Sequence, residues 1–198
     1  MSRMKRFTFN LAEVTKRFKY ANKDAFKRVY QNLMLEYGTR LHCNRFPIGN
    51  CIEYAIIDLT KEIEFPVIGH QNAKRIDMEI DGFGKFSIKY SSGGNNIKLH
   101  NSNNQSNTDI SMRNTLLVTP TTWWFLQPLE IENMGISLND YLKNTGDGLE
   151  LKSSILTALK KTHYPFMFDF DIRIDKSKCK NKEISRIIYD SIKQPKNT

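Results

Sequence analysis

Acidic residues and a lysine recur at every second position along residues 74–90, a pattern suited to holding a hard cation beside a phosphate. Asp77, Glu79 and Asp81 alternate with other residues, so a strand here would carry all three carboxylates on one face. Asp81 is followed by glycine, a pair typical of a tight hairpin turn. The alternation resumes after the turn and reaches Lys89, which predicts a two-stranded hairpin with the acids and this ammonium on a shared face.

The spacing of Asp77, Ser87 and Lys89 resembles the active-site hairpin of the PD-(D/E)XK nucleases, a superfamily that includes most type II restriction endonucleases. In that superfamily an Asp ends one strand, and an acid and a Lys one position apart lie on the next. This chain departs twice, because isoleucine replaces the proline before the Asp and Ser87 replaces the middle acid. Some restriction enzymes carry Ser there and bring the missing carboxylate from elsewhere in the fold.

A predicted helix before the hairpin supplies a further candidate acid. Ile52, Ile56 and Leu59 recur at helical spacing within residues 45–63, and Glu53 lies beside this apolar stripe. In the resembled superfamily a Glu on the helix before the hairpin commonly points at the metal ions, so the resemblance implies that role for Glu53. The alternative is an ordinary Glu at the boundary of a packed helix.

The resemblance implies Mg²⁺-dependent hydrolysis of DNA phosphodiester bonds, with Asp77 as the principal metal ligand. Either Glu53 or Glu79 would supply the acid that is absent at Ser87, and the helix gives Glu53 the better direction of approach. Lys89 would orient or help to deprotonate the attacking water and contact the scissile phosphate. Carboxylate-held Mg²⁺ suits this chemistry because it neutralises charge and lowers the pKa of water.

Positive charge is concentrated near the start of the chain. The net charge is +9 over the whole sequence, and residues 1–41 alone hold ten Lys or Arg against three acids. This asymmetry favours a polyanionic partner, and nucleic acid is the first candidate. Lys16, Arg17 and Lys19 fall on a predicted helix in this segment and are candidate DNA contacts. The alternative is a solvated basic helix surface.

Amide side chains are concentrated just after the hairpin. Residues 91–107 contain six Asn and one Gln. Asn and Gln pair bidentately with adenine, and a segment directly after a catalytic strand is well placed to lie along DNA. The candidate DNA contacts in this segment are Lys98, Asn101, Asn103 and Asn104. A flexible polar loop with no role in binding is the alternative.

The remaining periodicities predict one α/β or α+β domain over residues 1–198, with a mixed sheet of about five strands flanked by helices. Helices are predicted at 11–20, 22–38, 45–63, 136–142, 151–161 and 183–193. Strands besides the hairpin are predicted at 115–119, 121–126 and 164–174, with 97–99 continuing the sheet briefly. Trp123 and Trp124 face opposite ways on an extended chain, which predicts that at most one of them lies in the core.

Composition argues against several other classes of protein. Apolar residues make up 39% of the chain, and no apolar run approaches the roughly 18 residues that cross a bilayer. The basic first residues are not followed by the apolar core of a signal peptide, which predicts a cytoplasmic protein without a membrane segment. The three cysteines lack the paired spacing of a disulfide framework or a zinc site.

A sequence-specific type II restriction endonuclease is the favoured hypothesis, and two other functions stay open. One is a catalytically inactive DNA-binding or regulatory protein on the same fold, which the departure at Ser87 supports. The other is a repair or recombination nuclease with structure-specific cutting. The resemblance also implies a homodimer on double-stranded DNA if the target is palindromic, since each subunit then cuts one strand.

Overall fold

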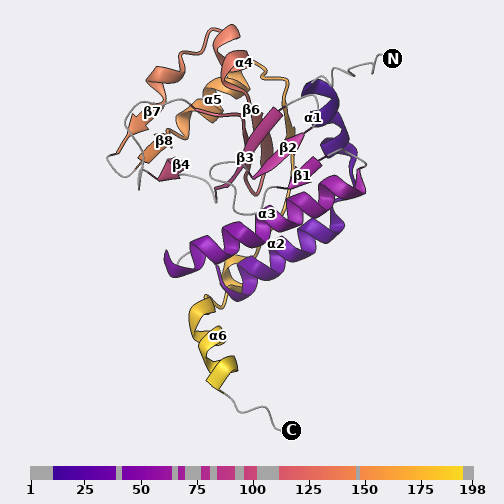
Figure 1. The fold of residues 1–198 in the computed structure, drawn as a ribbon, viewed down its shortest axis with the longest axis vertical. Helices are drawn as coiled ribbons and strands as arrows, with labels where there is room; N and C mark the ends of the chain where they lie inside the picture. The colour runs from indigo at the N-terminus through magenta and orange to yellow at the C-terminus, as the bar shows by residue number, and fades with distance from the viewer. Residues whose placement is uncertain are drawn as a thin grey trace, which may run out of the picture. The chain divides into compact units, whose positions relative to one another are not determined.

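The chain forms two compact units, shown as a ribbon in Figure 1. The structure is a computed structural model that describes residues 11–38, 42–63, 67–69, 77–80, 84–91, 96–101, 112–145 and 148–193. The first unit comprises Met1–Ala21 and Thr60–Asp171, and the second comprises Asn22–Leu59 and Ile172–Thr198. Both described sheets belong to the first unit, whereas the second is helical over its described residues.

A six-stranded mixed sheet is the centre of the first unit. Its strands, in spatial order, are β1 (Val67–Gly69), β2 (Met78–Ile80), β3 (Gly84–Tyr90), β5 (Thr115–Val118), β6 (Thr122–Leu126) and β9 (Met167–Asp169). β3 and β5 run parallel, and the other neighbouring pairs are antiparallel. The predicted mixed sheet flanked by helices is therefore confirmed, with six strands rather than about five.

The helix α1 (Leu11–Tyr20) packs on one face of this sheet, and its bounds are those predicted from helical spacing. The ring of Phe18 lies 5.3 Å from that of Phe125 and 6.1 Å from that of Trp123, measured between centroids. Phe125 also packs edge-to-face against Phe86 of β3. This aromatic cluster fixes α1 on the face that carries Phe86 and Phe125.

A second sheet and two helices cover the opposite face. This three-stranded sheet has the order β4 (Ile97–Asn101), β8 (Gly148–Leu151) and β7 (Leu142–Asn144). Its buried residues join α4 (Pro128–Asn133) and α5 (Ser154–Lys161) in one hydrophobic cluster with Leu117, Trp124 and Leu126. The segment around 97–99 is thus a strand of this second sheet, and the prediction that it continues the main sheet is wrong.

Trp123 and Trp124 are both buried, with exposed fractions of 0% and 1%, so the prediction that at most one lies in the core is wrong. The two side chains do point to opposite faces of β6. Trp123 packs against Phe18 and Phe168, whereas Trp124 joins the cluster under the second sheet. Because the sheet is covered on both faces, alternation along β6 does not separate a buried side from an exposed one.

Three predicted elements are shorter than expected. Residues 136–142 form the 3₁₀ turn Leu138–Asp140 before β7 begins, rather than a longer helix. The predicted helix over 151–161 begins at Ser154, because Leu151 pairs in β8. The predicted strand over 164–174 is regular only at Met167–Asp169, with one further backbone hydrogen bond at each end, from Phe125 to Phe166 and from Phe170 to Thr121. Pairing stops there because the chain before Thr121 turns back into β5.

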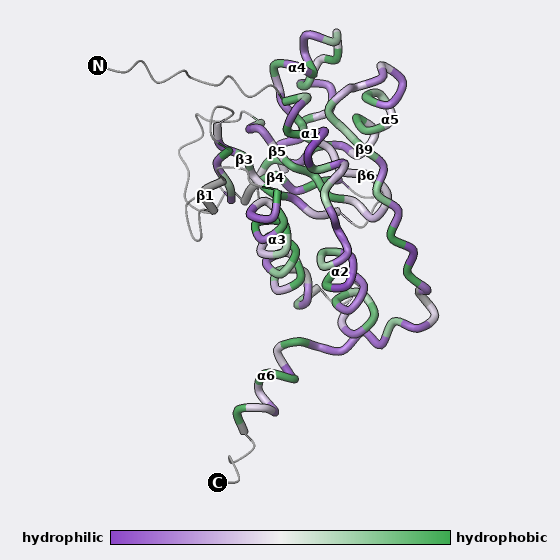
Figure 2. The backbone as a smooth tube through the Cα atoms, turned by 90° about the vertical axis from the view of Figure 1, so that its right-hand side faces the viewer, coloured by the Kyte–Doolittle hydropathy of each residue, from purple (hydrophilic) through white to green (hydrophobic). Residues whose placement is uncertain are grey.

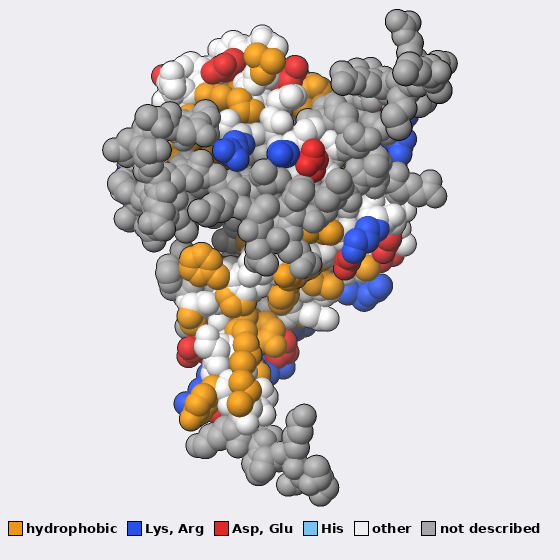
Figure 3. Space-filling model, viewed as in Figure 1, with side chains coloured by type: hydrophobic (Ala, Val, Ile, Leu, Met, Phe, Trp, Pro, Cys, Tyr) orange, Lys and Arg blue, Asp and Glu red, His pale blue; other side chains and the backbone are white. Residues whose placement is uncertain are grey.

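The second unit contains α2 (Asp24–Glu36), most of α3 (Arg45–Glu62), two 3₁₀ turns (His42–Asn44 and Lys176–Lys178) and α6 (Ile184–Lys193). The helices predicted over 45–63 and 183–193 are confirmed to within a residue or two. Figure 2 shows hydrophobic and hydrophilic residues alternating along α6, and Figure 3 shows its hydrophobic side chains at the surface. Within the ranges described, every helix is too short or too polar to cross a membrane.

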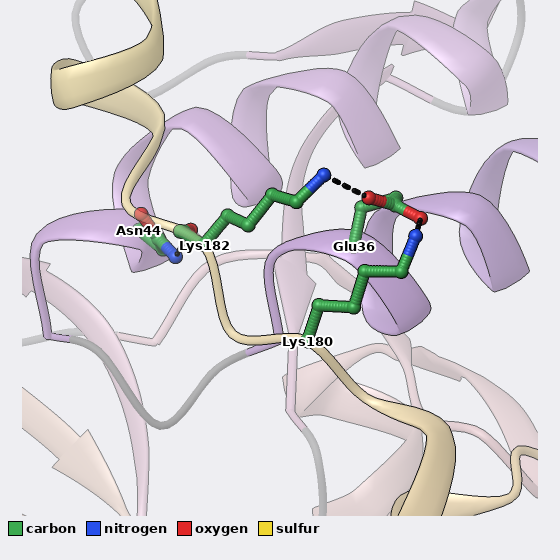
Figure 4. A network of polar contacts seen from close by, with 4 residues as sticks. All are labelled: Glu36, Asn44, Lys180 and Lys182. Atoms are coloured by element: carbon green, nitrogen blue, oxygen red, sulfur yellow. Dashed lines mark hydrogen bonds and ion pairs between the residues drawn. The ribbon is translucent and has the colours of Figure 1, made fainter.

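A buried amide joins α2 to the start of α6. Asn44 is 0% exposed, and its Nδ2 donates to the carbonyl oxygens of Tyr37 (2.9 Å) and Lys182 (2.8 Å). Its Oδ1 accepts from the backbone N–H of Ile184 at 3.0 Å. Glu36 pairs with the ammonium groups of Lys180 and Lys182, which precede α6, and these hydrogen bonds hold the pKa of the Glu36 carboxyl below its ordinary value (Figure 4).

Candidate active site

The predicted hairpin is present, and its register sets which side chains share a face. β2 and β3 pair antiparallel with Met78 opposite Phe86, and the backbone N–H of Asp77 donates to the carbonyl of Phe86 at 3.0 Å. Met78 and Phe86 are buried on one face. Asp77 and Ser87 lie one position away on their strands, so they project to the other face.

Asp77, Ser87 and Lys89 are brought together around one carboxylate oxygen. Ser87 Oγ donates to Asp77 Oδ2 at 3.0 Å, and the backbone N–H of Ile88 donates to the same oxygen at 2.6 Å. Lys89 Nζ lies 3.8 Å from it. The side chains of Lys89 and Asp77 are 28% and 18% exposed, so solvent and a ligand can reach both.

These hydrogen bonds orient the carboxylate of Asp77 rather than saturate it. Each of the interactions just described goes to Oδ2, and the second oxygen, Oδ1, takes no part in them. Charge-assisted hydrogen bonds from a backbone N–H and a hydroxyl are short and strong, so they hold the carboxylate plane in place. Ser87 therefore acts on the carboxylate of Asp77 as a hydrogen-bond donor.

Glu79 lies on the same face as Asp77 but opposite a lysine. The register places Glu79 directly across from Lys85. Directly opposite residues in an antiparallel pair have Cβ atoms about 4.5–5.5 Å apart, within reach of an ion pair between long side chains. A cation bound at Glu79 would compete with this ammonium, which makes Glu79 the less suitable partner of Asp77 for a metal.

Glu53 is half-buried on α3 and belongs to the second unit, so its role beside Asp77 stays a prediction. Among the described residues, no three His, Cys, Asp or Glu side chains gather closely enough to hold a metal ion by themselves. The described part of the first unit therefore offers Asp77 as a candidate metal-binding carboxylate, and Glu79 is a second one two residues further along the chain.

The polar face of the hairpin ends where the hydrophobic cluster begins. Ser87 lies beside Thr115, and Lys89 lies beside Leu117, which in turn lies beside Trp124. Leu117 and Trp124 belong to the cluster under β4 and β8, and β4 contacts β3. The site is thus bounded on one side by packed apolar residues that exclude water.

The predicted DNA contacts on α1 lie on the other side of the sheet. Phe18 packs against Phe125, whose face is opposite to that of Asp77. Lys16 and Lys19 are exposed, and Arg17 pairs with Glu13 of the same helix at 3.0 Å. These three cations do not share a face with the hairpin carboxylate, and their contact with DNA stays a prediction.

The amide-rich segment is only partly described. Lys98 is exposed on β4, and Asn101 ends that strand. Asn103 and Asn104 lie outside the described residues. Sequence reasoning passed over Lys85, although it lies two and four residues before Ser87 and Lys89 and therefore shares their face. The same alternation that revealed the other side chains could have found it.

Comparison with known proteins supports the architecture. No family model and no curated protein matches this sequence. The fold is similar to that of a restriction endonuclease solved in complex with substrate DNA, with a TM-score of 0.53 and 14% sequence identity. The match covers 91% of this chain and 95% of the other. The predicted restriction-endonuclease-like core is thus confirmed as a fold.

Proposed function

We propose that this protein is a Mg²⁺-dependent DNA endonuclease that cuts at a short specific sequence. The observation that carries the proposal is the meeting of Asp77 and Lys89 on one hairpin face, 3.8 Å apart, with the carboxylate held by Ser87 and a backbone N–H. The similar fold of a restriction endonuclease bound to substrate DNA supports the same substrate class. The net charge of +9 favours a polyanionic partner.

The residues present fit Mg²⁺ better than a cation that needs a complete protein cage. Mg²⁺ is usually bound through one or two carboxylates together with water and substrate phosphate oxygens. Asp77 would offer Oδ1, and Glu53 would supply a second carboxylate, with Glu79 as the alternative that faces Lys85. When bound, Mg²⁺ would neutralise charge on the phosphodiester and lower the pKa of a water molecule.

The other side chains orient the substrate and the nucleophile. Lys89 is partly exposed and its ammonium donates up to three hydrogen bonds, so it can hold a phosphate oxygen and an attacking water together. Ser87 keeps the Asp77 carboxylate in one orientation through its 3.0 Å hydrogen bond. In this proposal Lys89 and Ser87 position the phosphate, the water and the metal-binding carboxylate, and such positioning contributes most of the catalysis in phosphoryl transfer.

Binding to double-stranded DNA would combine the hairpin face with basic residues elsewhere. Lys98 is exposed on β4, next to the hairpin. The cations Lys16, Arg17 and Lys19 on α1 would reach DNA only if the duplex extends around the edge of the sheet. Replacing these three with Ala should lower the slope of log affinity against log salt by up to about 2.7, at about 0.9 for each phosphate that is no longer neutralised. An unchanged slope would remove α1 from the interface.

A homodimer follows if the target is palindromic, and α6 offers a self-complementary surface. Ile188 is 53% exposed and Ile192 is 78% exposed. A second α6 running antiparallel about a twofold axis at Ile188 would place Ile184 opposite Ile192, because these residues share one stripe of the helix at a spacing of four. An interface between identical surfaces requires this pairing of each residue with its complement.

Sedimentation at several protein concentrations tests the dimer. Ile188→Asp should convert a dimer to a monomer, because it places two carboxylates together on the twofold axis. Val29→Asp, at a residue that is 40% exposed on α2, is the matched control and should leave the dimer intact. A monomeric wild-type protein, or equal effects of the two substitutions, would exclude α6 as the interface.

A protein that binds DNA without cutting it is the second candidate, and Ser87 favours it because it supplies no carboxylate. Digestion of plasmid and long linear DNA with Mg²⁺, with EDTA as control, separates the candidates. Discrete bands support the proposal, whereas a smear or cleavage only at branched structures indicates a nuclease of another kind. DNA that is bound but stays intact at all Mg²⁺ concentrations would support the second candidate, a protein that binds DNA without cutting it.

A further inference from the structure

We propose that a pocket at the start of β3 and β5 binds a flanking nucleotide of the DNA, with its cations on a phosphate and its amides on a base edge. The pocket measures about 380 Å³. The polar side chains that line it are Lys85, Arg113, Asn114 and Gln127, and Met112, Pro128 and Leu129 complete the wall. This inference rests on the proposed DNA substrate and adds a site that determines specificity.

The charge of the pocket selects an anion. Lys85 and Arg113 contribute two positive charges, and the described residues that line the pocket include no carboxylate, although Glu79 lies across from Lys85 on β2. Both cations are exposed, so a large ligand can reach them. Guanidinium and ammonium groups are the common donors to DNA phosphates, where they fix the position of the backbone.

The pocket continues the face of the proposed catalytic side chains. Lys85 lies on the same strand and face as Ser87 and Lys89, two and four residues away. At about 3.3 Å per residue, Lys85 is about 13 Å from Lys89 along the strand. DNA rises about 3.4 Å per nucleotide, so the pocket would meet a nucleotide within about four steps of the scissile phosphate.

Backbone hydrogen bonds hold the two amide residues of the pocket, Asn114 and Gln127, in place. The carbonyl of Asn114 accepts from the N–H of Ser87 at 2.9 Å, which ties the pocket to the active-site strand. The N–H of Gln127 donates to the hydroxyl of Tyr164 at 3.2 Å, and this hydroxyl donates to the carbonyl of Phe125 at 2.7 Å. Tyr164 is 2% exposed, and burial raises the pKa of its hydroxyl, which therefore stays a donor.

A side-chain amide on hydrogen-bonded backbone, beside two cations, is suited to reading a base. Asn and Gln side chains donate to N7 or accept from N6 of adenine in the major groove, and a good bidentate pair discriminates against the wrong base. Asn114 directly precedes β5 and Gln127 lies between β6 and α4, so hydrogen-bonded backbone next to regular elements holds both residues in place. The geometry therefore points to adenine preference at one flanking position, read by Gln127 or Asn114.

Binding to a randomised duplex library in EDTA tests the pocket apart from cleavage. Lys85→Gln with Arg113→Gln should lower the salt slope by about 0.9, because the two cations together neutralise one phosphate. Gln127→Ala and Asn114→Ala should instead reduce selection of adenine at one position, by about 5- to 150-fold for a bidentate pair. Lys161→Ala and Asn139→Ala, at exposed residues of the same unit, are the matched controls and should change neither quantity.

The outcomes separate this inference from the proposed function. A wild-type protein that binds and cuts DNA while the pocket variants keep its salt slope and base preference would overturn the pocket alone. A wild-type protein that neither binds nor cuts DNA would overturn both. Thermal unfolding of each variant tests whether it is folded. Gln127→Glu is a second variant that keeps the size of the side chain but repels phosphate. Loss of adenine selection in Gln127→Glu with normal unfolding would support the pocket.

Discussion

Replacing Asp77 by Ala and by Asn should separate the stability of the hairpin from its chemistry. In the wild type, Oδ2 accepts the backbone N–H of Ile88 at 2.6 Å and the hydroxyl of Ser87 at 3.0 Å. Ile88 is only 6% exposed, so Asp77→Ala leaves its N–H without an acceptor and lowers the free energy of unfolding by about 1–3 kcal/mol. Asp77→Asn keeps a carbonyl oxygen for this N–H and should lose less than Ala.

Cleavage should respond differently from stability. Both substitutions remove the carboxylate proposed to bind Mg²⁺, so both should lower the cleavage rate by at least about 100-fold, since even outer partners of metal ligands contribute 10- to 100-fold. DNA binding in EDTA should be retained, and it should strengthen slightly because a negative charge leaves the interface. Asp77→Asn is thus the informative variant, well folded but inactive.

Urea unfolding followed by circular dichroism measures the stability, and digestion over a range of Mg²⁺ concentrations measures the chemistry. Asp140→Asn, at an exposed carboxylate that ends the 3₁₀ turn Leu138–Asp140, is the matched control and should change neither. Cleavage by Asp77→Asn near the wild-type rate would remove Asp77 from the metal site. Unchanged stability in Asp77→Ala would show that the hydrogen bonds to Oδ2 contribute nothing to the hairpin.

Three further predictions concern the second acid, the buried amide of Asn44 and the carboxyl of Glu36. Glu53→Ala should lose cleavage, and adding Ser87→Glu should restore part of it by returning a carboxylate to the hairpin; a normal Glu53→Ala beside an inactive Glu79→Ala would assign both acids to the strand. Asn44→Ala should lower the free energy of unfolding by about 3 kcal/mol, at about 1 kcal/mol for each hydrogen bond removed, as measured in urea; a decrease below about 0.5 kcal/mol would contradict the buried joint. Lys180 and Lys182 lower the pKa of Glu36, so the ionised carboxylate stabilises the fold at pH values above its ordinary pKa of 4.5. This contribution disappears as the pH falls through the lower pKa of the folded state. Unfolding of wild type and Glu36→Gln should therefore differ at pH 7 and converge in acid, and a difference that is independent of pH would refute this.

The faces of the hairpin were readable from the sequence alone. A side-chain period of two is a local property of any strand, so the alternation through Asp77, Ser87 and Lys89 already predicted which groups would meet. The bounds of α1 and α3 followed in the same way, because helical periodicity over ten or more residues needs no distant partner.

Tertiary structure alone decided what covers each face and where strands stop. Trp123 and Trp124 are both buried because α1 packs on one face of β6 and the second sheet on the other, and no local pattern records a second covering layer. The pairing of β9 stops after Phe170, whose N–H donates to the carbonyl of Thr121, because the chain before Thr121 turns back into β5. The pocket at Arg113 and Gln127 likewise joins residues that flank two paired strand ends, since the register of β5 with β6 places Thr115 beside Leu126.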